Sequence, residues 1–538
     1  MEELGQAEWL DLEQKILNIK TNGRSLVELT AYRGIALWWL IRFRLYHSAR
    51  SRQSINLLIK NTYLFSLVDF LHDFFTAILC RVLSSCFKVK TGKKRPMVLI
   101  TAHDRNWRNV NDPTGGSRKC DVFFDSLIHE LKKRDYRIVT LTPLKYSISE
   151  IKKMIEKLSS QKNTIHKEFN TYWSIKTWKK GHDAKRHFRN IWKNVSENDE
   201  KFVESLEKYR LTSESSYYFK SIFGYVVKFI EMAKELIEKE EPDLILVISE
   251  YGVSEKALVV AGRLKKVPTL AIQHGSIGPL HKGYIYSKNN ISASGSIKSP
   301  YCPIPDKTAV YGPYYYNLLT KMSSFPPSSI VITGQPRYDI LAVTDRVYSR
   351  EKFCSELNLD PDRKIALVAT ENIPIPEGKA FLRSVLKALR NFPELQIVVK
   401  PHPGERREWY KKVVEEENVR AVVLSRGSDT FEALNACDLF VTGFSTIITE
   451  AIILGKMGVT VHIGKREDPT PYYKDVTLRI YEQEDLVPAI RKVLYDKKTR
   501  EKLKKTGKKF VYQHVYKQDG KATERVADLI EEMIKRKQ

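Results

Sequence analysis

The chain has 538 residues, several times the size of an average domain, so we expect two or three domains that each bury a core. Its 90 Lys and Arg against 64 Asp and Glu give a net charge of +26, which favours polyanionic partners: nucleic acid, an anionic membrane or phosphorylated substrates. This size and composition exclude a peptide-like or disordered protein. No RNA-reading consensus, helix-turn-helix signature or paired-cysteine zinc spacing supports nucleic acid beyond the charge.

The six cysteines are scattered and form neither a disulfide framework nor a CxxC pair, which indicates a reducing, cytoplasmic setting. The acidic start at Glu2 and Glu3 lacks the basic and apolar segments of a secretory signal.

Residues 1–94 are richer in apolar and aromatic side chains than the rest. They hold an apolar run at 36–41, in which Trp38 and Trp39 precede Arg42, and an aromatic stretch at 63–87. Charged residues interrupt the second stretch, whereas a membrane-spanning helix needs about 20 mostly apolar residues. We therefore expect an amphipathic helical region on the inner face of the membrane, where Trp and Arg suit the headgroup boundary. The alternative is a pair of helices packed on the protein body.

From residue 95 onward, short apolar runs alternate with amphipathic helices. Continuous β-branched runs of this kind predict parallel strands buried on both faces. The charged stretch at about 146–215 shows no strand pattern and predicts a helical insert. The prediction is an α/β protein with two Rossmann-like doubly wound domains facing a cleft, at 95–345 and 346–538, after the helical extension. The expected strands are 97–100, 136–141, 244–248, 269–272, 308–311, 330–332, 365–368, 395–399, 419–424, 439–442 and 459–462.

Ligands of such sheets bind beyond the carboxyl ends of strands, so the loops there are the candidate site. The loop after 395–399 has prolines on both sides of His402, which fix the backbone that carries the imidazole. A histidine held in this way can donate to a phosphate, with Lys400 adding charge. The alternative is a turn in which His402 satisfies a local carbonyl. The loop reads Lys400, Pro401, His402, Pro403, Gly404 and Glu405.

The loop after 439–442 contains Gly443, Ser445 and Thr446 and leads into a helix with Glu450. Small residues at a helix start present free N–H groups to an anion. Ser445 also suits the role of N-cap, and both roles are compatible. Glu450 is placed to accept from ribose hydroxyls, or is an ordinary exposed helix residue.

Two loops of the first domain supply candidate proton acceptors. The loop after 269–272 begins with Gln273, His274, Gly275 and Ser276, where glycine permits close approach of a ligand and His274 suits acid-base work near neutral pH. The loop after 244–248 places Glu250 on the same side of the sheet as a competing base.

These residues resemble motifs of the GT-B superfamily of nucleotide-sugar enzymes over roughly residues 95–535. That group includes UDP-N-acetylglucosamine 2-epimerases, CDP-glycerol glycerophosphotransferases, polysialyltransferases and capsule-type transferases. His402-Pro403 is similar to their HP motif, Ser445-Thr446 to their Ser-Ser motif, and His274-Gly275 to the catalytic His-Gly of the glycerophosphotransferases. The segment at 332–339, which contains Gly334, looks like the end of the epimerases' first domain.

The chain also departs from these families. Glu371 follows Ala369 and Thr370, where the epimerases have His-Arg, and Glu250 stands where they have Asp. The paired glutamates of retaining transferases are absent around Glu450, because Thr442 occupies the earlier position. Transfer with inversion is therefore favoured over epimerisation.

The resemblance implies a GT-B glycosyltransferase that moves a sugar from a CMP- or UDP-sugar to a cell-surface polysaccharide or a lipid-linked glycan. It implies neither a metal nor a cofactor besides the nucleotide sugar. His274 or Glu250 is the expected base. The expected phosphate and nucleotide ligands are Lys400, His402, Pro403, Gly443, Ser445, Thr446 and Glu450, with Gln273, Gly275, Ser276, Gly334 and Glu371 in the cleft loops. The alternatives are an epimerase, a glycerophosphotransferase, and a non-enzymatic polyanion-binding protein. No oligomeric state follows from the sequence.

Overall fold

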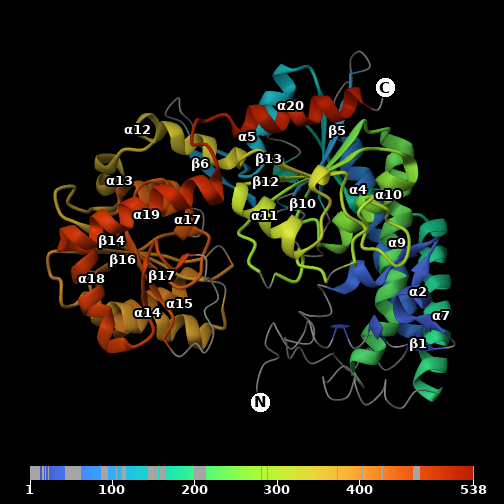
Figure 1. Ribbon diagram of the computed structural model, residues 1–538, viewed down its shortest axis with the longest axis horizontal. Coiled ribbons are helices and arrows are strands. Elements are labelled where there is room, and N and C mark those ends of the chain that lie inside the picture. The colour runs from blue at the N-terminus through green and yellow to red at the C-terminus, as the bar shows by residue number, and fades with distance from the viewer. Residues whose placement is uncertain are drawn as a thin grey trace.

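The computed structural model contains two parallel β-sheets, each covered by helices and lying side by side (Figure 1). The predicted fold class, two doubly wound α/β domains, is confirmed. The structure describes residues 13–14, 17–18, 20–21, 23–42, 62–86, 95–103, 106–111, 117–142, 152, 155–157, 164–198, 214–279, 281–287, 289–371, 373–402, 404–425, 428–463 and 473–536.

The first sheet has seven strands, and every pairing in it is parallel. Its central strands are continuous apolar runs and are buried on both faces, as their sequence predicts. The helices α5 (Asp125–Lys133), α9 (Glu214–Glu240), α10 (Val253–Lys265) and α11 (Pro313–Met322) surround it. The spatial order is β13 (Ile330–Ile332), β12 (Lys307–Val310), β11 (Thr269–Ile272), β10 (Leu244–Ile248), β5 (Met97–Thr101), β8 (Arg137–Thr142) and β9 (Ile165–Glu168).

The edge strand β9 corrects the prediction for the insert at 146–215. The sequence at 165–168 is Ile-His-Lys-Glu, which carries no apolar run, yet it pairs with β8 in parallel. An edge strand needs only one hydrogen-bonding partner and one buried face, so polar residues are tolerated in it. Helix α7 (Ile175–Asn198) follows after the short helix η3 (Phe169–Tyr172) and agrees with the predicted helical character.

A second difference is the antiparallel hairpin of β6 (Trp107–Asn111) and β7 (Ser117–Asp121), which is not among the predicted strands.

The second sheet has six strands, again all parallel, and five of them lie within two residues of the predicted ranges. Its helices are α14 (Ile375–Leu389), α15 (Arg407–Glu416), α16 (Thr430–Ala436), α17 (Ile447–Ile453), α18 (Leu486–Tyr495) and α19 (Lys497–Val515). The spatial order is β16 (Ala421–Val423), β15 (Gln396–Lys400), β14 (Ile365–Ala369), β17 (Leu439–Thr442), β18 (Gly458–Val461) and β19 (Leu478–Ile480).

The last helix, α20 (Ala522–Lys535), crosses back to the first domain (Figure 1). Val526, Ala527 and Ile530 are buried in the same core as β5 and β10. The expected domain at 346–538 is therefore wrong at its end, because the amphipathic face of α20 packs beneath the first sheet. This crossing ties the two domains together.

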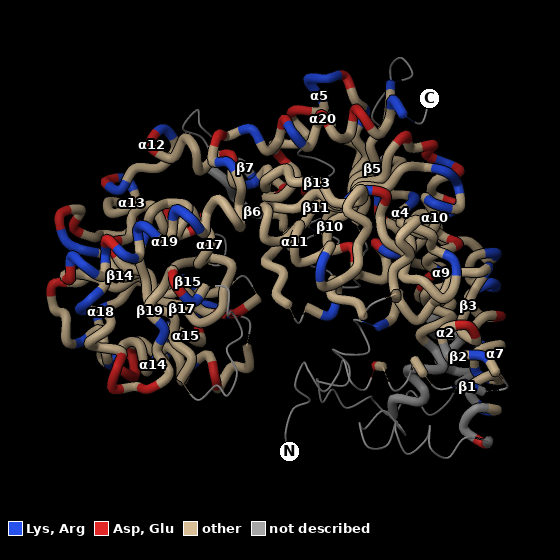
Figure 2. Tube along the Cα trace, viewed as in Figure 1, with Lys and Arg blue, Asp and Glu red and all other residues tan. Residues whose placement is uncertain are grey.

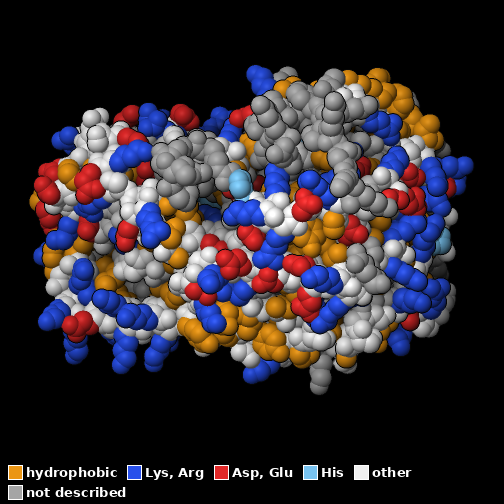
Figure 3. Space-filling model, turned by 90° about the horizontal axis from the view of Figure 1, so that it is seen from above, with side chains coloured by type: hydrophobic (Ala, Val, Ile, Leu, Met, Phe, Trp, Pro, Cys, Tyr) orange, Lys and Arg blue, Asp and Glu red, His pale blue; other side chains and the backbone are white. Residues whose placement is uncertain are grey.

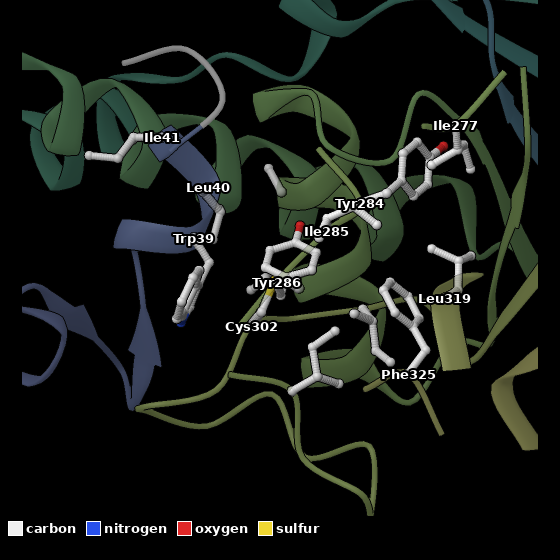
Figure 4. Close-up of a cluster of buried hydrophobic side chains, with 14 of the residues drawn as sticks. Trp39, Leu40, Ile41, Ile277, Tyr284, Ile285, Tyr286, Cys302, Leu319 and Phe325 are labelled. Atoms are coloured by element: carbon white, nitrogen blue, oxygen red, sulfur yellow. The ribbon is translucent and has the colours of Figure 1, made fainter. Parts of the chain in front are cut away.

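The apolar run at 36–41 is part of the protein core. Trp38 and Trp39 are 1% and 2% exposed, and Trp39 packs edge-on against Tyr286 at 5.8 Å between ring centroids (Figure 4). Its indole N–H donates to Pro300 O at 2.7 Å. For these residues, the alternative of packing on the protein body holds and the membrane-surface prediction is wrong.

Arg42 is also buried, with its guanidinium bound in a fork to both carboxylate oxygens of Glu13 at 2.5 Å. The arginine that we expected beside lipid phosphate therefore has an internal carboxylate as its partner. Among the described residues, no helix is long and apolar enough to cross a membrane.

Candidate functional site

The loops at the carboxyl ends of β14, β15 and β17 lie next to one another, because these three strands are neighbours and parallel. The corresponding loops of the first sheet follow β10 and β11, which are also neighbours. Direct contacts between the two sets of loops mark a junction between the domains.

His402 is held by its own loop and by the end of β14. Its backbone N–H donates to Thr370 Oγ1 at 3.0 Å and to Glu405 Oε2 at 3.1 Å. Its Nδ1 accepts from the N–H of Gly404 at 3.0 Å. Since Nδ1 is an acceptor, the neutral ring carries its proton on Nε2, the nitrogen that is able to donate to a ligand.

The carboxylate of Glu405 stabilises this loop. It accepts from the hydroxyl of Tyr410 at 2.5 Å and from that of Thr370, in addition to the N–H of His402. Glu405 is buried, and three donors offset the cost of desolvating its charge. His402 therefore lies in a fixed turn rather than a loose one.

Lys400 and Glu371 are both buried at this edge of the sheet. The carboxylate of Glu371 accepts from the N–H of Phe444. A Cβ on Gly443 would lie 2.6 Å from Glu371 Oε1, so only glycine permits this approach. One of the N–H groups that we predicted for a phosphate is thus bound to a side chain of the protein. Pro403 lies outside the described residues.

Ser445 and Thr446 begin α17. Ser445 Oγ accepts from the N–H of Ile447 at 3.4 Å, but the residue at the N-cap is Thr446, and its side chain makes no cap hydrogen bond. Ser445 is half-buried and Thr446 is exposed.

Glu450 is 3% exposed, so the prediction of an ordinary exposed helix residue is wrong. Its Oε1 lies 2.9 Å from Arg337 Nη1, and Arg337 belongs to η5 (Pro336–Val343) of the first domain. The guanidinium also lies 4.7 Å from the ring of Phe431 and 5.5 Å from that of Phe123. Glu450 therefore joins the two domains through a buried ion pair, which competes with the predicted contact to ribose.

His274 is half-buried at the end of β11. Its Nε2 lies 3.1 Å from the hydroxyl of Tyr251, whereas its Nδ1 is buried. Tyr251 itself is held against Tyr284 and His281, and a Cβ on Gly283 would lie 2.4 Å from its ring. The packing of Tyr251 thus fixes the hydroxyl that His274 Nε2 contacts.

Glu250 turns away from the junction. Ser249 has φ of +56°, and the tight turn that it makes directs Glu250 back toward the sheet. Glu250 is 4% exposed, and its Oε2 accepts from Thr308 Oγ1 of β12 at 3.2 Å. Burial raises the pKa of Glu250 to about 7, against the lowering effects of Lys256 and of the Thr308 hydrogen bond.

The two domains meet directly at the predicted loops. The hydroxyl of Tyr473 lies 3.2 Å from Ser276 Oγ of the first domain and 2.7 Å from Thr449 Oγ1 of α17. A Cβ on Gly275 would lie 4.0 Å from Thr446 Cγ2. The structure therefore brings the His274 loop and the Ser445-Thr446 loop together, as the sequence prediction requires.

Two of the predicted cleft residues, Gln273 and Gly334, make contacts that stabilise the fold. Gln273 is fully buried, donates to Gly275 O at 2.7 Å and accepts from the N–H of Tyr311 at 2.9 Å, so it shapes the loop. Gly334 has φ of +79° and would bring a Cβ within 3.1 Å of Ala522. It lies beneath α20, and its prediction as a cleft residue is wrong.

Sequence reasoning missed Tyr251, Tyr473 and Arg337. Tyr251 follows Glu250 directly and lies in an already suspected loop, so its proximity was a usable signal. Tyr473 and Arg337 act through contacts between distant segments, which no local pattern predicts. Among the described residues, no group of three or more His, Cys, Asp or Glu is placed to hold a metal ion.

An open hollow of about 830 Å³ lies away from these loops, between α7 and the hairpin of β3 (Ala31–Tyr32) and β4 (Ile35–Ala36). Its lining combines the basic residues Arg33, Lys176, Lys179 and Lys180 with Asp183 and with apolar and aromatic side chains.

Residues 310–531 match the family model described as UDP-N-acetylglucosamine 2-epimerase. The predicted resemblance to this group of enzymes is thereby confirmed for this part of the chain. The match spans β12 to α20 and so includes the loops of His402 and Ser445.

Solved structures with a similar chain course include the UDP-GlcNAc 2-epimerase of Neisseria meningitidis bound to UDP-GlcNAc, at 13% identity and a TM-score of 0.49, over 81% of this chain and 100% of that one. The MnaA–UDP co-structure of S. aureus aligns at 11% identity and a TM-score of 0.48, over 82% of this chain and 97% of that one. The wall teichoic acid polymerase TagF soaked with CDPG aligns at 12% identity and a TM-score of 0.45, over 87% and 98%. A comparison with curated proteins gave no match.

Proposed function

We propose that the protein is a glycosyltransferase that binds a CMP- or UDP-sugar at the junction of its two domains. The observation that carries this proposal is the meeting of the His274-Gly275-Ser276 loop with the start of α17, beside a fixed His402. An acceptor hydroxyl bound near His274 and a donor phosphate bound near His402 would then face each other.

His402 and Lys400 act on the donor phosphate in this proposal. The Nε2–H of His402 donates to a phosphate oxygen, and the Lys400 ammonium adds positive charge from the end of β15. Negative charge grows on this phosphate as the bond to the sugar breaks, so both interactions strengthen in the transition state. Ser445 and Thr446 add hydroxyl donors from the start of α17.

His274 is the proposed base, and Glu250 is the weaker candidate. The Nε2 of His274 takes the proton of the acceptor hydroxyl, directly or through the hydroxyl of Tyr251 at 3.1 Å. The half-buried position of His274 and the burial of Glu250 beneath the sheet support this choice. The attack proceeds with inversion and without a metal.

The acceptor belongs to the same proposal. We infer a cell-surface polysaccharide or a lipid-linked glycan, extended by a protein that lies peripherally on the inner face of the membrane. The excess of basic residues supports a negatively charged surface or substrate.

The second candidate is a UDP-N-acetylglucosamine 2-epimerase, and the family match over residues 310–531 favours it. A glycerophosphotransferase would use the same loops. The replacement of His-Arg by Ala369 and Thr370 disfavours epimerisation, because it removes the basic residues that the epimerases carry there.

A polyanion-binding protein without enzymatic activity is the candidate from another class. Basic and acidic residues both occur along the outer helices (Figure 2), and the face in Figure 3 shows the same mixture. Nucleic-acid binding that depends on salt and survives loss of His402 would favour this candidate.

A thermal-shift panel of UDP- and CMP-sugars tests the proposal, because a ligand of the folded state raises the melting temperature. We expect one nucleotide class to stabilise the wild type and to lose that effect in His402→Ala. His187→Ala on the exposed side of α7 is the control and keeps the shift. NMR of the stabilising donor without acceptor then separates the candidates: a C2 epimer identifies an epimerase, whereas an intact donor that is consumed only with a glycan acceptor identifies transfer. No shift with any donor contradicts both.

A further inference from the structure

Helix α4 (Thr62–Cys86) lies against the first domain with one face. Asp73 forms a buried ion pair with Lys228 at 2.5 Å, and Ala77 and Cys80 are buried beside η3. Phe70 contacts Trp178 at 5.0 Å between ring centroids. This inner face fixes the helix and therefore fixes which side chains point outward.

The outer face of α4 carries four exposed apolar side chains at helical spacing. Leu71, Phe75, Ile78 and Val82 are 41%, 64%, 41% and 52% exposed, and steps of four, three and four residues place them on one stripe. Single exposed apolar residues are ordinary on protein surfaces, whereas a continuous stripe on one helix is typical of an interaction site. We call these four residues the α4 stripe.

Among the described side chains of α4, which begin at Phe70, Arg81 is the charged one that is exposed with the stripe, and its guanidinium donates to the backbone oxygens of Thr171 and Trp173. Arg81 is thus held against η3. Asp73 lies on the inner face of the helix.

The sequence on both sides of α4 is strongly basic. Residues 43–61 contain four Lys or Arg and no acidic residue, and residues 87–95 contain five and no acidic residue. The first turns of α7, which pack on α4 through Trp178, add Lys176 and Lys179. Glu235 is close to Lys176 at 3.9 Å and offsets part of this charge.

We propose that the α4 stripe docks on an anionic lipid surface. The apolar side chains enter the boundary between headgroups and acyl chains, and the exposed Lys176 and Lys179 of α7 attract the lipid phosphates. Charge complementarity selects lipid as the partner, because these lysines and the basic sequence on both sides of α4 favour an anionic surface. The Trp38-Trp39 run, which lies in the core, has no part in this contact.

This inference deepens the membrane location in the proposed function and rests on it, but its test needs no nucleotide. The experiment is co-sedimentation of the full chain with vesicles of phosphatidylcholine alone and of phosphatidylcholine mixed with phosphatidylglycerol. Wild type is expected to bind the mixed vesicles, with an affinity that falls as salt rises. The variant with Phe75→Glu and Ile78→Glu is expected to bind these vesicles at least about tenfold more weakly.

Met322→Glu is the matched control, because Met322 is 52% exposed on α11 and outside the stripe. It is expected to bind vesicles as wild type does. Phe75→Ser removes the largest side chain without adding charge and should fall between the two. Unchanged melting temperatures and an unchanged shift with nucleotide sugar show that the variants fold and that the nucleotide site is separate.

Equal vesicle binding by wild type and the double variant would overturn the proposal, and so would binding without preference for the anionic lipid. A wild-type dimer that the double variant converts to a monomer, with vesicle binding unchanged, would assign the stripe to a second copy instead. A normal vesicle result with no donor binding would leave this inference standing and would contradict the proposed function.

Discussion

The loops at the ends of the two sheets are built differently. In the second domain, polar contacts join the loops to one another: Glu405 holds His402, and Glu371 holds the N–H of Phe444. In the first domain, the two candidate bases have different surroundings. Glu250 is buried, whereas His274 contacts the hydroxyl of Tyr251. Under the proposed function, the loops of the second domain form the donor side and the His274 loop forms the acceptor side.

The largest effect is expected from His274→Asn. Loss of a general base lowers turnover by about 10² to 10⁴-fold, while the affinity for the donor changes little because phosphate contacts lie in the other domain. Steady-state rates with the donor found in the panel measure this. Glu250→Gln is the comparison, and it should keep most of the turnover. A reversed order, with Glu250→Gln the slower enzyme, would make the buried carboxylate the base.

The next largest effect is expected at the ion pair between the two domains. Arg337→Ala leaves the Glu450 carboxylate buried and unpaired, which should destabilise the fold by about 3 kcal/mol. Urea denaturation measures the loss. Lys535→Ala breaks the exposed pair with Glu531 and should change stability far less than Arg337→Ala does, because solvent screens the pair. If Arg337→Ala instead kept full stability and lost donor affinity, Glu450 would serve the ribose, as its sequence position suggests.

The pH dependence of stability separates a buried Glu250 from an open one. Its pKa in the fold, about 7, lies above the ordinary 4.5, so the protonated carboxyl stabilises the fold fully below about pH 4.5. That contribution is lost as pH rises through 7. Relative to wild type, Glu250→Gln should therefore gain about 3 kcal/mol between pH 4.5 and pH 8. Urea midpoints at both pH values measure the gain, and a constant difference would place Glu250 in water.

Much of the fold follows from the sequence because parallel strands are continuous apolar runs. The ranges 244–248, 269–272 and 439–442 are reproduced without change. Strand β9 was not predictable from its pattern, since Ile-His-Lys-Glu gains its place by pairing at a sheet edge. The crossing of α20 was missed for a similar reason, because its amphipathic face does not say which sheet it covers.

For the site, the sequence located the loops but not the direction of each side chain. His402 and His274 lie where the pattern of strand ends predicts. Glu250 has the same local signal and turns inward, because Ser249 adopts a left-handed turn that no residue type there required. Trp38 and Trp39 show the same limit: an apolar run beside an arginine fits a membrane boundary and a core with a buried ion pair equally well.

The central claim is that His402 binds the phosphate of a nucleotide, and calorimetric titration with UDP and CMP tests it most directly. We predict saturable binding of one nucleotide by wild type and about 10- to 100-fold weaker binding by His402→Ala, the loss of one hydrogen bond to a charged group. His187→Ala should bind as wild type does. Equal affinities of wild type and His402→Ala would contradict the account.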